Sequence, residues 1–248
     1  MTTTTTTNNN DDMTSQFGNV DVEGIKFGEP TKLSTGGVMI YTNNSTGYGN
    51  PTWQSPEKML VKFPISLPQT EGQGHKKVTI ELAEGPYLEW LKSLDERIVE
   101  ALTQNSEKWF KKPLSKEVVA DKYSPIAKQS DPKYPYLMKF RVPEKHDGDS
   151  DKKQATKVFL VNSSVTECED STVDCVEQYG LVTARLKLIG LYFVGSQVYP
   201  LINAEEMLVY PPEDGRGTKR MTEGCSLSLS EPMTYKKPKM ETAAVETM

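Results

Sequence analysis

The stretch from Trp109 to Val142 sets positively charged side chains among planar rings. Residues 104–145 contain ten basic and five acidic side chains, in a chain whose net charge is −5. Rings offer faces on which unpaired bases can stack, and cations neutralise the phosphates between them. The pattern therefore predicts a local face that binds a single nucleic-acid strand.

The candidate binding residues fall into two chemical groups. The cations would line a groove and release counterions from bound phosphates: Lys108, Lys111, Lys112, Lys116, Lys128, Lys133, Lys139 and Arg141. The rings would stack bases without reading their sequence: Trp109, Tyr123, Tyr134 and Tyr136. Tyr48 and Trp53 lie in a polar loop at 42–56 with no evident core partner, so they are candidates for additional stacking.

An ordinary structural role is the alternative for the same stretch. It would then be a solvated amphipathic helix followed by a strand, with tyrosines in the core and lysines on the surface. Two observations favour binding. The chain has eleven tyrosines against seven phenylalanines, and tyrosine suits a ring with one wet edge. Charge is also segregated, because residues 146–179 contain eight acidic and only three basic side chains.

Groups that could catalyse a reaction or hold a metal are sparse. The two histidines, His75 and His146, lie in loops rich in Gly and Asp. Cys168 and Cys175 lie in an acidic segment that disfavours a thiolate, and they lack the second ligand pair of a zinc site. We therefore predict a protein that is not an enzyme and needs no cofactor or metal.

The elements that must position the basic stretch follow from periodicity. Alternating residues predict short strands at residues 20–27, 38–41, 59–63, 76–82, 136–142, 155–161, 181–194, 198–203 and 207–210. A stripe from Leu88 to Leu102 predicts one long helix, and Ser115 begins a short helix that ends near Lys122. The predicted fold is α+β, a mainly antiparallel OB-like barrel or sheet with one long and one short inserted helix.

Composition divides the chain into one domain and two tails. We expect a domain at residues 18–212, between a disordered Thr/Asn-rich tail at 1–17 and a disordered tail at 213–248 with two basic clusters. Those clusters are compatible with a nuclear-import signal or with a plain solvated tail. The absence of a long apolar run and the odd number of cysteines predict an intracellular protein without a membrane span.

The order of several short motifs resembles a known group of viral proteins. These motifs are Trp109-Phe110-Lys111-Lys112, Tyr123-Ser124-Pro125-Ile126, Lys133-Tyr134-Pro135 and Gly190-Leu191-Tyr192-Phe193-Val194. Over roughly residues 20–210 the chain is similar to proteins of nucleo-cytoplasmic large DNA viruses, above all those of algal and amoebal viruses. That group is in turn similar to phage single-stranded DNA-binding proteins with an OB-fold.

The resemblance implies non-enzymatic coating of single-stranded DNA during viral replication, recombination or repair. It also implies a host nucleus or cytoplasmic viral factory as the location, and it allows replication proteins and a second copy of the chain as further partners. The phage type ends in an acidic tail, whereas residues 211–248 contain six acidic and six basic side chains. The alternative is a structural or scaffolding protein of a virion that makes only protein–protein contacts.

Overall fold

The computed structural model describes Phe17 and residues 19–34, 36–68, 75–144, 155–161, 168–171 and 173–210. The predicted tails at 1–17 and 213–248 otherwise lie outside the described residues. Phe17 itself, which the prediction assigned to the tail, is buried and packs its ring against Tyr87 and Trp90. The packed domain therefore includes this residue.

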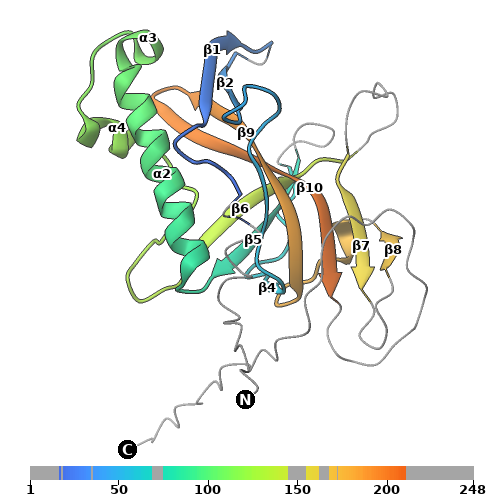
Figure 1. Cartoon of the computed structure of the whole chain (residues 1–248). Coiled ribbons are helices and arrows are strands. Elements are labelled where there is room, and N and C mark those ends of the chain that lie inside the picture. Colours follow the sequence, from blue (N-terminus) through green and yellow to red (C-terminus); the bar gives the residue numbers. More distant parts are fainter. Residues whose placement is uncertain are drawn as a thin grey trace, which may run out of the picture.

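In the described part of the chain, five strands come first, three consecutive helices follow, and five more strands complete the domain (Figure 1). The strands are β1 (Lys26–Lys32), β2 (Val38–Asn43), β3 (Thr52–Gln54), β4 (Met59–Leu60), β5 (Lys76–Leu82), β6 (Tyr136–Val142), β7 (Lys157–Val161), β8 (Cys168–Ser171), β9 (Leu181–Val194) and β10 (Gln197–Tyr210). The helices are α2 (Pro86–Gln104), α3 (Ser106–Phe110) and α4 (Lys116–Lys122), and a 3₁₀ turn spans Val173–Cys175. No described helix is long and apolar enough to cross a bilayer.

The described strands form one mixed sheet in the order β1-β2-β9-β10-β6-β5. Most pairs are antiparallel, and β10 pairs in parallel with β6 and β7. β4 pairs with β9, and bridges from Val61 to Ile80 and from Ser66 to Lys77 connect the following segment to β5. Pairing thus runs from β9 to β4, from the segment after β4 to β5, and then through β6 and β10 back to β9. The predicted OB-like α+β fold, mainly antiparallel, is confirmed.

Helix α2 covers the core face of the sheet (Figure 1). Gly85 is its N-cap residue, with a φ of 147° that suits glycine, and Pro86 occupies the first helical position. The predicted stripe is confirmed, since Leu88, Leu94 and Leu102 are almost fully buried. Each such side chain stabilises the fold by roughly 1.5–3 kcal/mol relative to an exposed one.

Three differences from the predicted elements have physical causes. The strand expected at 20–27 lies instead at Lys26–Lys32, where a register shift accommodates Pro30 in an edge strand. The two pieces expected at 198–203 and 207–210 form the single strand β10, because a register shift between Ala204 and Glu206 interrupts the alternation. Three further short elements, β3, β8 and α3, occupy segments with too few residues to show a period.

Candidate nucleic-acid interface

A groove of about 440 Å³ lies on the open face of β5, β6 and the start of β10. Its far wall is the segment from Ser124 to Ser130, which connects α4 to β6. Four lining residues are cations, and none of the lining residues is acidic: Lys77, Lys128, Lys139 and Arg141. The groove is therefore an anion-attracting hollow built from one sheet face and one loop.

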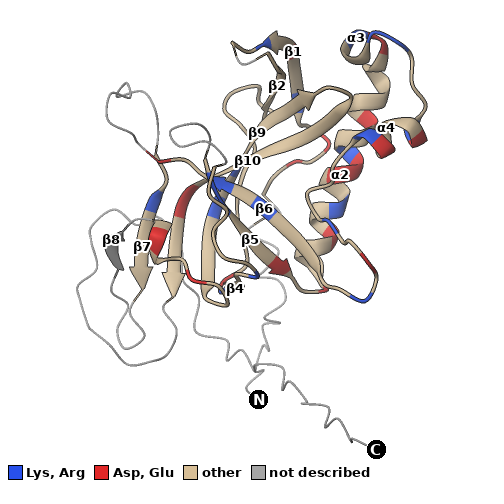
Figure 2. Cartoon of the chain, turned by 180° about the vertical axis from the view of Figure 1, so that it is seen from behind, with Lys and Arg blue, Asp and Glu red and all other residues tan. Residues whose placement is uncertain are grey.

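The two-residue period of the strands brings these cations together. In β6, Met138 and Phe140 point into the core, so Lys139 and Arg141 point to the open face. In β5, Lys77 lies directly opposite Arg141 in the antiparallel register. Figure 2 shows the resulting basic residues along β6, whereas α2 and α4 carry basic and acidic residues side by side.

The groove cations lack acidic partners among the described residues. No ion pair within that part of the chain involves Lys77, Lys128, Lys139 or Arg141. Burial lowers the pKa of Lys77, and the positive charges of Arg141 and Lys139 lower it further. Burial also lowers the pKa of the half-buried Arg141 guanidinium, an effect opposed by Tyr192. Because like charges are held together here, a bound anion would relieve their repulsion.

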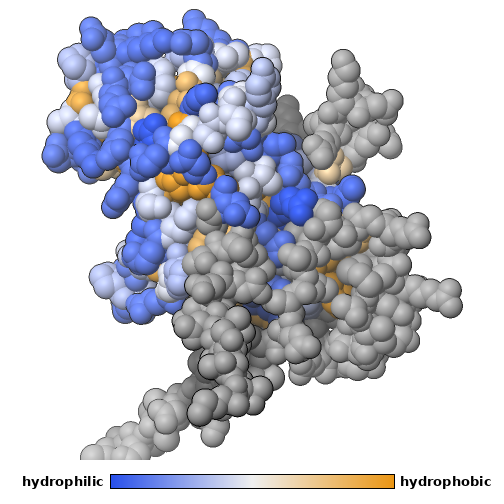
Figure 3. All heavy atoms as spheres, in the orientation of Figure 1, coloured by the Kyte–Doolittle hydropathy of each residue, from blue (hydrophilic) through white to orange (hydrophobic). Residues whose placement is uncertain are grey.

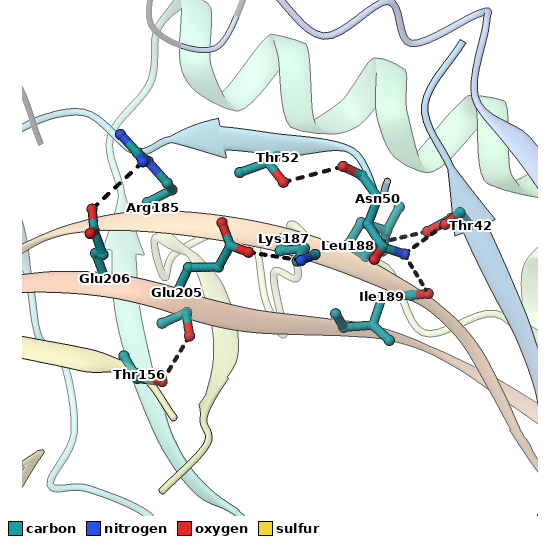
Figure 4. A network of polar contacts seen from close by, with 11 residues as sticks. Thr42, Asn50, Thr52, Thr156, Arg185, Lys187, Leu188, Ile189, Glu205 and Glu206 are labelled. Atoms are coloured by element: carbon teal, nitrogen blue, oxygen red, sulfur yellow. Dashed lines mark hydrogen bonds and ion pairs between the residues drawn. The ribbon is translucent and has the colours of Figure 1, made fainter. Parts of the chain in front are cut away.

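The neighbouring region of the same sheet is arranged differently (Figure 4). Lys187 Nζ lies 2.8 Å from Glu205 Oε1, and Arg185 lies 3.6 Å from the buried carboxylate of Glu206. These pairs neutralise the far halves of β9 and β10. At the groove end of this face, by contrast, Lys77, Lys139 and Arg141 have no ion pair with a described acidic residue.

Two exposed rings line the groove and were missed by the sequence reasoning. Phe63 is 47% exposed and Tyr199 is 41% exposed. Tyr199 pairs across the sheet with Tyr192, which places a second tyrosine on the same face. The alternation of β10 could have identified Tyr199 from the sequence. Val198 is an apolar core residue, so its neighbour Tyr199 must point outward.

A buried carboxylate holds the groove wall. Asp95, on α2, accepts hydrogen bonds from the hydroxyl of Tyr123 at 2.6 Å and from the backbone N–H groups of Ile126 at 2.8 Å and Ala127 at 3.1 Å. Burial raises the pKa of Asp95 to about 6, against the opposing effect of these hydrogen bonds. The pKa of Tyr123 is raised too, first by burial and then by the Asp95 charge.

Two predicted stacking residues belong to the core, which corrects their assignment. Tyr123 is 6% exposed because its hydroxyl is bound by Asp95, and its ring faces inward. Trp53 is 2% exposed because β3 inserts it against α2, where its Nε1 donates a hydrogen bond of 3.0 Å to Tyr87. Neither ring is available to stack on a base in this structure.

The remaining predicted residues are distributed over several places. Lys128, Lys139 and Arg141 share the groove, whereas Trp109 and Lys112 line a second hollow of about 320 Å³. Three predicted lysines form ion pairs outside the groove: Lys108 with Glu29, Lys116 with Glu100, and Lys133 with Asp131. These three lysines line neither hollow, and neither do four further predicted residues: Tyr48, Lys111, Tyr134 and Tyr136.

A metal site in the described residues would need several ligating side chains close together. Within those ranges no group of three or more His, Cys, Asp or Glu side chains could hold a metal ion. His146 and the acidic loop around it lie outside the described residues.

The chain is similar to known proteins at the level of three-dimensional structure. No protein-family model and no curated protein sequence matches the chain. Among solved structures, it is similar to the single-stranded DNA-binding protein from bacteriophage Enc34 in complex with ssDNA, with a TM-score of 0.42 and 12% identity over 76% of this chain and 98% of the other. A C-terminal truncation of that protein gives a TM-score of 0.40, with 11% identity over 76% of this chain and 97% of the other. Likenesses this distant support no conclusion about function, which has to rest on the groove.

Proposed function

We propose that this protein binds single-stranded DNA in the groove formed by β5, β6, β10 and the segment from Ser124 to Ser130. The observation that carries the proposal is the set of four groove cations without a described acidic partner, next to the exposed rings of Phe63 and Tyr199. Phosphates would neutralise the cations, and bases would stack on the rings.

The binding is physical and involves no chemical step. A strand entering the groove would place its phosphates near Lys139 and Arg141, with Lys128 on the opposite wall. Stacking favours unpaired bases, because base faces are hidden inside a duplex. The protein would therefore prefer single strands over double-stranded DNA and would show little sequence preference.

The biological setting is part of the same proposal. Binding of this kind serves replication, recombination or repair, here within an infected cell and alongside viral replication proteins. The rival proposal is a structural virion protein that uses this face for protein contacts. Unpaired cations favour the nucleic-acid role, because charged residues are depleted from the centres of protein interfaces.

Fluorescence anisotropy with a labelled oligothymidylate of about 20 nucleotides tests the proposal, with the matching duplex as a competitor. We expect submicromolar binding to the single strand that weakens steeply between about 50 and 200 mM salt. Micromolar or weaker binding that ignores salt would overturn the proposal. Equal affinity for single strand and duplex would also overturn it.

A further inference from the structure

The second hollow has the same two kinds of side chain as the groove. It lies between α3, the end of α4 and the turn that joins β9 to β10. Its cations are Lys112 and Lys122, and its rings are Trp109, Phe110 and Phe193. Like the groove, it has no acidic residue among those that line it.

Two chain segments connect this hollow to the groove. Lys122 lines the hollow, whereas Ser124 lines the groove, and only Tyr123 separates them. In the neighbouring strand, Ser196 lines the hollow and Tyr199 lines the groove. The segments run in parallel and are paired by the bridge between Tyr123 and Val198, with a hydrogen bond of 2.9 Å from Ser124 N–H to the Val198 carbonyl.

This pairing makes the two hollows neighbours. Both segments pass from the second hollow to the groove in the same direction, so the hollows lie on either side of one bridge. Lys122 and Ser124, which line the two hollows, are two residues apart, and two residues of extended chain span roughly 7 Å. The two hollows are therefore separated by a distance of this order. The side chains of Tyr123 and Val198 are buried, so they do not rise between the hollows.

We propose that the second hollow is a further nucleotide subsite, in which Lys112 and Lys122 bind a phosphate and Trp109 or Phe110 contacts a base. This inference rests on the proposed function of the groove, because the same DNA strand would continue across the Tyr123–Val198 bridge. Short oligonucleotides would fill the groove alone. Longer ones would reach both sites and gain affinity through the high local concentration of the attached nucleotide.

The length dependence of binding tests this subsite. The charge reversals K112E and K122E are combined in one variant, and K26E with K92E provides a control with the same change in net charge. Oligothymidylates of about 6 and about 20 nucleotides bracket the length needed to cover one OB-like site. We expect K112E/K122E to bind the short oligonucleotide as the wild type does and the long one roughly tenfold more weakly.

The outcomes separate the two proposals. If K112E/K122E and the control bind both lengths alike, the second subsite is wrong and the groove is unaffected. If the wild type binds neither oligonucleotide, the groove proposal itself fails. Photo-crosslinking of the wild-type chain with 5-iododeoxyuridine avoids any effect of the variants on folding. Crosslinks to Trp109 or Phe110 from the long oligonucleotide support the subsite, and crosslinks confined to Phe63 and Tyr199 overturn it.

Discussion

The groove and the inserted helices contain similar numbers of lysines but use them differently. On the helices, Lys92 lies 2.9 Å from Glu89, and Lys116 lies 3.8 Å from Glu100. In the groove, Lys128 and Lys139 have no such partner among the described residues. On the side seen in Figure 3 the described helical surface is mostly hydrophilic, with small apolar spots. On the proposed function, we therefore expect a lysine without a described acidic partner to bind a phosphate better than a lysine that is already paired.

Charge reversal in the two regions should give the largest contrast. We expect K128E/K139E to weaken binding of oligothymidylate by roughly 100-fold at low salt, because two phosphate contacts become repulsive. The matched variant K92E/K116E changes net charge equally and should bind within about threefold of wild type. Anisotropy titrations measure both, and equal losses in the two variants would mean that only overall charge matters.

Removing a groove ring should have the next largest effect. Phe63→Ala and Tyr199→Ala should each weaken binding by about tenfold, since one stacked base contributes roughly 1–3 kcal/mol. Tyr48, which is 85% exposed but lines neither hollow, provides the control. A Tyr48→Ala loss as large as that of Tyr199→Ala would place the stacking surface elsewhere.

The salt dependence of binding offers a finer measurement. Lys139→Gln should reduce the slope of log K against log salt concentration by about 0.7, the value for one phosphate on a single strand. Lys116→Gln should leave the slope unchanged, because that lysine already has Glu100 nearby. A slope that is unaffected by Lys139→Gln would show that Lys139 does not contact phosphate.

Replacing Asp95, which holds the groove wall, should have the smallest effect on DNA binding. Its effect on the pH dependence of folding stability should nevertheless be measurable. The folded chain holds the Asp95 proton more tightly than the unfolded chain, because its pKa is raised from 3.8 to about 6. The stability gained from this proton is present below pH 3.8 and is lost as pH rises through about 6. Urea unfolding should therefore show that the stability advantage of wild type over Asp95→Asn shrinks by roughly 1–3 kcal/mol across this range and then stays level. An advantage that grows with pH would contradict the burial of this carboxylate.

The periodicity of apolar residues in the sequence predicted most of the strands and the long helix. Alternation placed strands at Lys76–Leu82, Tyr136–Val142 and Leu181–Val194, and the apolar stripe placed α2, because each depends on neighbours within a few residues. Short elements such as β3 were missed, since three residues show no period.

The candidate site was predictable only in part. The basic stretch contains Lys128, Lys139 and Arg141, but it also contains Tyr123, whose burial depends on Asp95, 28 positions earlier in the chain. Lys77, Phe63 and Tyr199 join the groove only through strand pairing across long sequence separations. No local pattern contains that information, and the acidic partners of the other lysines are likewise set by the fold.

Lysine acetylation with mass spectrometry tests the central claim most directly, by comparing the free chain with the chain saturated with oligothymidylate. The bound strand should protect Lys128 and Lys139 from acetylation, whereas Lys92 and Lys116 should react equally in both states. Protection of Lys92 and Lys116, with Lys128 and Lys139 still reactive, would contradict the assignment of the groove as the binding site.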